Sequence, residues 1–140
     1  MSPRILIAAA AAVFCVAISS TSAQKPTTND GVYTKAQADK AKAQFDKICA
    51  DCHPFTVAAK KKPKDVLLGD DPFYDNWTGR QLAQMITTIA LTMPNDGSAT
   101  VTEEEAADLV AYILQQNGFK PGKQPLTKAT ATAVVERPNK

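Results

Sequence analysis

Histidine, cysteine and aromatic side chains are scarce in this sequence of 140 residues. The chain holds one histidine and three cysteines, and aromatic residues make up only 6% of it. A structural zinc site uses four Cys or His ligands, usually in two spaced pairs, so this inventory argues against one. A thioredoxin-like site needs a βαβ pattern, and no such run of strands is visible. A chain with so few aromatic residues would form a thin core by itself, and a buried cofactor would supply the missing apolar surface.

The charge is nearly balanced, and no apolar run is long enough to cross a bilayer. A formal net charge of +2 gives no reason to expect nucleic-acid binding. The apolar run 5–18 is shorter than the roughly 20 residues that a membrane span needs. It follows Arg4 and precedes small residues at 21–23, which is typical of a cleaved secretory signal. We therefore predict a signal peptide over residues 1–23 and export to the periplasm, with an uncleaved membrane anchor as the alternative.

Two cysteines lie three positions apart and are followed at once by the single histidine. The motif from Cys49 to His53 reads Cys-Ala-Asp-Cys-His, which is the attachment signature of a c-type haem. One helical turn presents both sulfurs to the two haem vinyl groups, and the adjacent imidazole lies beneath the iron as the proximal ligand. We predict one haem c, covalently attached at Cys49 and Cys52, with His53 as a metal ligand. A disulfide between the two cysteines is the alternative, but it would leave the histidine unexplained.

Helical periodicity and capping patterns predict three main helices, over about 34–50, 78–91 and 102–118. Each range opens on a Thr-x-x-Gln or Thr-x-x-Glu pattern, as in a capping box. Apolar residues then recur at helical spacing. The first helix would carry the haem motif at its C-terminal end, and residues 54–76 should be mostly loop.

Polar and proline-containing segments flank this helical region. Residues 24–33 are polar and are predicted to be a short leader. Residues 120–140 contain three prolines with scattered Lys and Thr, and we expect an extended or mobile C-terminal tail without a core of its own. The predicted domain is therefore 34–119.

The sixth iron ligand should be a methionine, because the only histidine is already used. Met1 would leave with the signal peptide. Met85 lies in the middle of a predicted helix on its apolar face, a position typical of a core residue. Met93 follows the end of that helix and precedes Pro94, so its thioether could reach the haem face opposite the histidine. We favour Met93, because His/Met ligation raises the iron potential and suits electron transfer.

The chain resembles the class I c-type cytochromes, the monohaem cytochrome c family, from residue 34 to about 119. The resemblance rests on the haem motif, on Met93-Pro94, on the helix order and on Ala41 to Phe45. It implies an all-α fold, with three main helices around one covalently bound haem c. It also implies that Phe45 packs against Tyr112 of the last helix.

The resemblance implies further residues of the haem site. The segment 76–80 resembles the family segment whose Trp and Arg approach the haem propionates, so Trp77 and Arg80 are candidate cofactor-binding residues. A proline carbonyl usually accepts the hydrogen bond of the ligand histidine in this family, and Pro63 is the candidate here. The chain departs from the family at Pro54, where a glycine is common.

We interpret the chain as an exported electron carrier that passes one electron between redox partner proteins, and not as an enzyme. Haem catalysis would require an open iron site with acid–base groups, and the single histidine is already engaged. The alternative is a cytochrome c subunit of a periplasmic quinoprotein-type dehydrogenase or of an oxidase complex. A gas sensor would require Met93 to dissociate readily from the iron.

The lysines at 60, 61, 62 and 64 have two interpretations. They form either a solvated loop or a docking patch for an acidic redox partner, where charge would speed the encounter more than it adds affinity. A membrane would be a partner only if the N-terminal segment is not cleaved.

Overall fold

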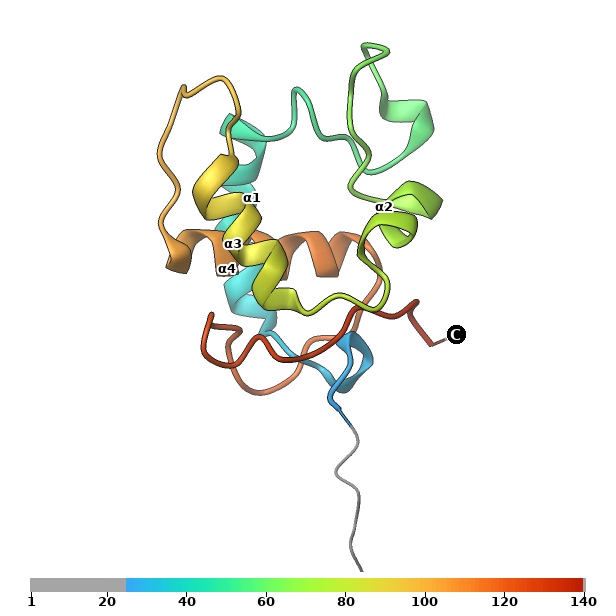
Figure 1. Cartoon of the computed structure of the whole chain (residues 1–140), viewed down its shortest axis with the longest axis vertical. Helices are drawn as coiled ribbons and strands as arrows, with labels where there is room; N and C mark the ends of the chain where they lie inside the picture. The colour runs from blue at the N-terminus through green and yellow to red at the C-terminus, as the bar shows by residue number, and fades with distance from the viewer. Residues whose placement is uncertain (1–24, 140) are drawn as a thin grey trace, which may run out of the picture.

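The computed structural model describes residues 25–139, and its regular structure is helical (Figure 1). In chain order the elements are the 3-10 turn η1 (Thr28–Asp30), α1 (Lys35–Ile48), the 3-10 turn η2 (Val57–Ala59), α2 (Asp70–Trp77), α3 (Leu82–Thr92) and α4 (Glu103–Gln116). The predicted all-α fold is confirmed, with one more α-helix in this range than predicted. None of the helices in this range is long and apolar enough to cross a membrane. The predicted signal peptide, residues 1–23, lies outside the described residues.

Helix α1 begins at the predicted cap and ends at the haem motif. The Thr34 hydroxyl accepts a hydrogen bond from the backbone amide of Gln37 at 3.2 Å, and the Ala- and Lys-rich sequence that follows has high helix propensity. The buried side chains recur at helical spacing: Ala38, Ala41 and Phe45. Cys49 is the C-cap residue, so the haem motif starts where the helix ends, as predicted.

The Gln37 side chain does not complete the predicted capping box. Instead it donates to the Asp108 carboxylate at 2.9 Å and to the Leu126 carbonyl at 2.7 Å, and it accepts from the Leu126 amide at 2.8 Å. Lys40 forms an ion pair with the buried Asp108 at 2.8 Å. These bonds join α1, α4 and the C-terminal segment, and they satisfy a carboxylate that would be costly to bury alone.

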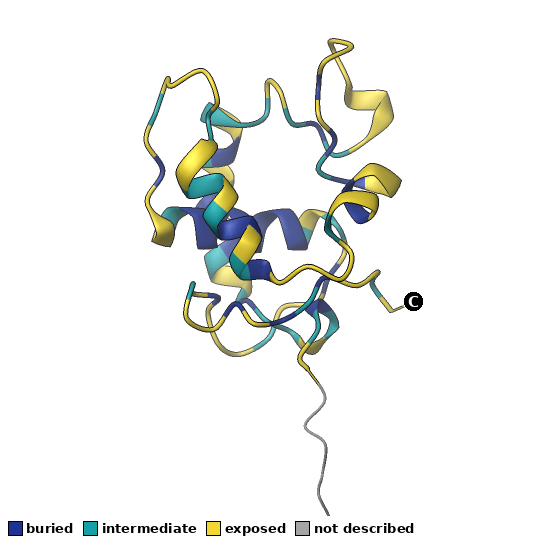
Figure 2. Ribbon diagram, in the orientation of Figure 1, coloured by how far each residue is buried: buried dark blue, intermediate teal, exposed yellow. Residues whose placement is uncertain are grey.

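Helix α4 is the centre of the core, and it packs against both α1 and α3 (Figure 2). Its predicted capping box is present: the Glu105 amide donates to the Thr102 hydroxyl at 3.2 Å, and the Thr102 amide donates to the Glu105 carboxylate at 2.8 Å. All residues from 106 to 114 are buried. A helix buried on all sides must be covered by several other elements, and the rest of the chain folds around α4.

Residues 54–76 are mostly loop, as predicted, but the prediction missed helix α2, which begins within them. Its first turn holds the carboxylates of Asp70 and Asp71, and negative charge is favourable at that end of the helix dipole. Pro72 also lies in the first turn, where its missing N–H breaks no helical hydrogen bond. The Asp-Asp-Pro sequence was therefore a usable signal for a helix start.

The predicted capping box at 78–81 is also wrong. Thr78 is the C-cap of α2, and its amide donates to the Tyr74 carbonyl at 2.9 Å. Helix α3 starts only after Gln81, whose side chain makes no capping hydrogen bond. The Thr-Gly-Arg-Gln sequence is thus a connection between two helices.

Residues 120–139 contain no helix or strand, but this segment packs onto the domain. Its buried side chains are Leu126, Ala131, Ala133 and Val135. The amides of Leu82 and Ala83, in the first turn of α3, donate to the carbonyls of Ala133 and Ala131, each at 2.9 Å. The segment after residue 119, predicted as an extended or mobile tail, thus supplies apolar side chains to the core and acceptors to a helix end.

The predicted polar leader is also part of this packing. Thr28 is fully buried, and its amide donates to the Val134 carbonyl at 2.9 Å. The Val134 amide donates in turn to the Pro26 carbonyl at 2.9 Å. Both ends of the described chain thus meet beneath α3 (Figure 1).

Candidate haem site

The haem motif forms a tight turn directly after α1. The amides of Cys52 and His53 both donate to the Cys49 carbonyl, at 3.1 Å and 2.9 Å. Both cysteines are free thiols; Cys49 is half-buried and Cys52 is exposed. Burial raises the pKa of the Cys49 thiol to about 11, because the apolar surroundings disfavour the thiolate. The turn therefore holds two thiols and an imidazole together on one short stretch of chain.

The imidazole of His53 is oriented by a backbone carbonyl. Its Nδ1 lies 3.1 Å from the Val66 carbonyl oxygen, and this contact requires Nδ1 to carry the proton and to donate it. The lone pair is then on Nε2, which is the arrangement that a metal-binding histidine needs. The predicted acceptor, Pro63, is wrong: its carbonyl accepts from the Lys60 ammonium at 3.3 Å. The prediction placed the acceptor three residues too early in the same loop.

Two further hydrogen bonds fix the loop that carries this acceptor. The Val66 amide donates to the Cys52 carbonyl at 2.9 Å, and the Leu68 amide donates to the Pro54 carbonyl at 3.0 Å. Residues 66–69 therefore run alongside residues 52–55. At Gly69 an added Cβ would lie 2.1 Å from the Phe55 carbonyl oxygen, so only glycine permits this close approach.

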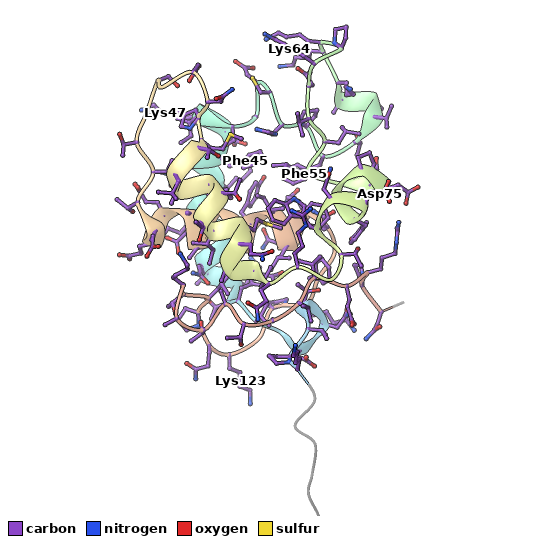
Figure 3. The ribbon with its side chains drawn as sticks, viewed as in Figure 1. Phe45, Lys47, Phe55, Lys64, Asp75 and Lys123 are labelled. Carbon is purple, nitrogen blue, oxygen red and sulfur yellow. The ribbon has the colours of Figure 1, made fainter. Side chains whose placement is uncertain are left out.

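Three aromatic rings pack together near the motif, and Figure 3 labels two of them, Phe45 and Phe55. The ring centroids of Phe45 and Tyr112 lie 5.1 Å apart, which confirms the predicted contact between the first and last helices. Phe55 stacks on Phe45 at 5.1 Å and meets Tyr112 edge-on at 6.0 Å. Phe55 was not predicted to take part, although it lies two residues after the histidine. The three rings form an apolar contact between α1 and α4 next to the motif.

Met93 lies on a different segment from His53. It is the C-cap residue of α3, and it is half-buried. It lines a cavity of about 500 Å³, which is formed by the end of α3 and the loop leading to α4. Met85, in contrast, is only 2% exposed and belongs to the hydrophobic core. Met85 thus lies in the core, as expected, and Met93 lies at a helix end; iron binding by Met93 stays a prediction.

Trp77 and Arg80 lie close to each other at the connection between α2 and α3. The Arg80 guanidinium is 5.7 Å from the centroid of the Trp77 ring. The C-terminal segment holds this connection, because the Gly79 amide donates to the Val135 carbonyl and the Val135 amide to the Arg80 carbonyl, both at 2.9 Å. The two residues form one unit, and their predicted role toward the haem propionates stays a prediction.

The lysine-rich loop is bonded to the motif that it follows. The Lys61 ammonium lies 3.5 Å from the carboxylate of Asp51, inside the motif. Lys64 is exposed at the tip of this loop (Figure 3). Part of the positive charge is therefore balanced locally, and part faces solvent.

The donor atoms present fit a c-type haem. Two adjacent thiols suit two thioether bonds, and a neutral imidazole together with a thioether suits haem iron. Within residues 25–139, no group of three or more His, Cys, Asp or Glu side chains could hold a metal ion such as zinc.

One family model matches the chain, over residues 36–113, and its description is Cytochrome C oxidase, cbb3-type, subunit III. The matched range begins in α1 and ends in α4, and it includes the haem motif and Met93. No curated protein matches the chain, and no solved structure matches it. The predicted resemblance to c-type cytochromes and the predicted haem c are thereby confirmed. The chain belongs to the family of cytochrome c oxidase, cbb3-type, subunit III, a c-type cytochrome domain that transfers electrons through haem c.

Proposed function

We propose that the chain is a periplasmic carrier of single electrons between redox partner proteins. Cys49 and Cys52 would hold the haem covalently, and His53 and Met93 would supply the two protein ligands of the iron. The observation that carries the proposal is the His53 side chain, whose Nδ1 bonds the Val66 carbonyl while two free thiols precede it on the same turn. The spacing of the motif and the orientation of the imidazole thus both support His53 as a ligand of the iron.

Each part of the chain has a distinct task in this proposal. When bound, haem c supplies an iron that accepts and releases one electron. The two thiols would tether the group beside His53, while the Val66 carbonyl keeps the imidazole in the tautomer that leaves Nε2 free to bind iron. Met93 would close the sixth position, which leaves the iron without a free site for substrate. No residue has to bind or release a proton during transfer, and we therefore propose no catalytic residue.

Covalent attachment tests the central part of the proposal. Acid–acetone extraction of the mature protein should leave the haem with the polypeptide, since thioether bonds resist acid. Cys49→Ser and Cys52→Ser should each leave one thioether bond, and the double variant should release all the haem. Haem that is extracted completely from the wild type would contradict the proposal.

His53→Ala should remove the proximal ligand, and we expect most of the folded haem protein to be lost with it. Lys47→Ala is a suitable control, because Lys47 is an exposed residue near the end of the same helix (Figure 3). The absorption spectrum of the ferrous protein is the measurement. A His53→Ala spectrum identical to that of the wild type would exclude His53 as the ligand.

A second candidate function is a subunit of a respiratory oxidase or of a quinoprotein-type dehydrogenase. The family description, which is that of an oxidase subunit, favours it. A free carrier should elute as a small soluble protein after export, whereas a subunit should co-purify with its complex in stoichiometric amounts. Co-purification that survives high salt would favour the subunit, because weak carrier–partner contacts are screened by salt.

Export through residues 1–23 is part of the proposal. Mass spectrometry of the protein from the periplasm should show a chain that begins at Gln24. A chain that retains the first 23 residues would favour a membrane anchor.

The exposed lysines of the 60–64 loop would dock an acidic redox partner. Their replacement by Ala should slow electron transfer at low salt and have little effect at high salt. If the rate of electron transfer is the same without these lysines, they have no docking role and only form a solvated loop.

A further inference from the structure

A buried carboxylate lies inside the lysine-rich loop. Asp65 is only 6% exposed, although lysines surround it in the sequence. Its Oδ2 accepts hydrogen bonds from the amides of Lys61 at 2.8 Å and Lys62 at 2.9 Å. Its Oδ1 is buried without a hydrogen-bond partner. The carboxylate is therefore held by the backbone of the loop.

Burial of this group requires compensation. A carboxylate that leaves water loses several kcal/mol of solvation unless hydrogen bonds replace the lost water. The Lys62 and Lys61 amides supply that replacement, and they hold the pKa of Asp65 below its ordinary value. The Asp65 amide also donates to the Lys62 carbonyl at 3.1 Å. Residues 61–65 consequently form a closed turn, with the Asp65 side chain at its centre.

The residue after this turn supplies the acceptor of the histidine. The Val66 amide bonds the Cys52 carbonyl at 2.9 Å, and the Val66 carbonyl lies 3.1 Å from His53 Nδ1. Val66 directly follows Asp65 in the chain. A change in the turn would therefore move the Val66 peptide relative to the imidazole.

We propose that Asp65 is a positioning residue for the iron ligand. By capping the amides of Lys61 and Lys62, its carboxylate sets the Val66 peptide, whose carbonyl accepts the hydrogen bond from His53. This inference rests on the proposed function, in which His53 binds the iron. A histidine that donates from Nδ1 is a more basic ligand and favours ferric iron. Loss of the hydrogen bond should therefore raise the reduction potential.

The test compares variants of the haem-loaded protein that separate charge from position. Asp65→Ala removes both the charge and the acceptor. Asp65→Asn keeps an oxygen for the two amides and removes the charge, whereas Asp65→Glu keeps the charge and displaces the oxygen by one methylene. Asp75→Asn is the matched control, because Asp75 is an exposed carboxylate on α2, outside both the haem motif and the 61–65 turn (Figure 3). Should Asp65→Ala fail to fold, the Asn and Glu variants still decide the question.

Two readouts are followed, the solvent exchange of the His53 Nδ1 proton in the ferrous protein by NMR and the reduction potential. We expect exchange to be roughly threefold to tenfold faster in Asp65→Ala and Asp65→Glu, as for the loss of one hydrogen bond. The potential should rise in both variants, since the imidazole becomes a weaker donor. Asp65→Asn and Asp75→Asn should leave the proton exchange unchanged.

Three results would overturn the role of Asp65. The first is a His53 Nδ1 proton that exchanges at the wild-type rate in both Asp65→Ala and Asp65→Glu. The second is a proton that exchanges as fast in Asp65→Asn as in Asp65→Glu. The third is a control that accelerates exchange as much as Asp65→Ala does. Failure of the proposed function would appear separately, as a wild-type protein in which His53 is not bound to iron.

Discussion

Two methionines of the same helix have different surroundings. Met85 is held in the hydrophobic core at 2% exposure, whereas Met93 is the half-buried C-cap of α3 and lines a cavity. A thioether packed in a core is not free to bind iron without unpacking. Only Met93 combines a loop position with an accessible side chain.

Met93→Ala should open the sixth position of the iron. We expect the ferric protein to lose its near-infrared sulfur-to-iron charge-transfer band, the potential to fall, and the ferrous protein to bind carbon monoxide. These changes follow because the thioether favours ferrous iron and blocks small ligands. Absorption spectroscopy and a redox titration measure them.

Met85→Leu is the control for this experiment. It should keep the band and cost at most about 1.5 kcal/mol, as for a core substitution that nearly conserves volume. A wild type that already binds carbon monoxide, together with a Met93→Ala variant that behaves identically, would instead support a sensor or an enzyme.

At the scale of elements, α3 depends on a distant segment for its N-terminal cap. Its own N-cap residue, Gln81, makes no side-chain capping bond, and the carbonyls of Ala131 and Ala133 accept the amides of its first turn. Because Met93 ends the same helix, the C-terminal segment also supports the proposed ligand.

Deletion of residues 130–140 should free the amides of Leu82 and Ala83 and destabilise the protein. The loss of the buried Val135 side chain alone costs about 1.5 kcal/mol or more. Amide exchange at the start of α3 should accelerate, and the charge-transfer band should weaken. Deletion of residues 138–140 is the control, because it leaves these hydrogen bonds in place. Equal protection of both amides in the two deletions would exclude the capping role.

Helix α4, in contrast, is capped by its own sequence. Thr102→Ala should cost about 1 kcal/mol of stability at neutral pH, as for the loss of an N-cap hydroxyl. Urea unfolding at pH 7 measures the difference. No loss of stability would mean that the Thr102 hydroxyl does not support the helix.

The same capping box predicts a dependence on pH. The Thr102 amide and hydroxyl hold the pKa of Glu105 below its ordinary value of 4.5. Because the folded pKa is the lower one, the ionised Glu105 stabilises the fold above pH 4.5, and the effect disappears as the pH falls through the folded pKa. Glu105→Gln should therefore lower the urea midpoint at pH 7, and the gap to the wild type should close in acid. A gap that stays constant from pH 7 to acid would contradict this.

At the scale of the whole molecule, the two ends of the domain are joined by a close backbone contact. An added Cβ at Gly122 would lie 1.7 Å from the Gly31 carbonyl oxygen, and the Gly122 amide donates to the Tyr33 carbonyl. The Tyr33 hydroxyl donates to the Phe119 carbonyl at 2.6 Å. The leader and the chain after α4 therefore belong to one packed unit.

Gly122→Ala should push these two segments apart and cost about 1–3 kcal/mol, as for overpacking in a closely packed region. The urea midpoint should fall. Lys123→Ala is the control at the next residue, which is exposed (Figure 3), and it should stay within about 0.5 kcal/mol of the wild type. A Gly122→Ala variant as stable as this control would show that the contact relaxes freely.

Local patterns predicted the features of this protein that depend on neighbours in sequence. The haem motif, the start of α1 at Thr34 and the capping box of α4 all involve residues within four positions of each other. The contact of Phe45 with Tyr112 was predicted only through the family resemblance. The start of α2 at Asp70 had a local signal that was misread as a loop.

Only the tertiary structure decided the features that join distant residues. The acceptor of His53 is the Val66 carbonyl and not that of Pro63, because the backbone pairing of residues 66–69 with 52–55 sets which carbonyl faces the imidazole. The cap of α3 likewise comes from Ala131 and Ala133, about fifty residues away. Every residue has the same backbone carbonyl, so only the packing of the chain decides which carbonyl accepts a given hydrogen bond. Thiols, an imidazole and capping hydroxyls belong to particular residue types and can therefore be identified from the sequence.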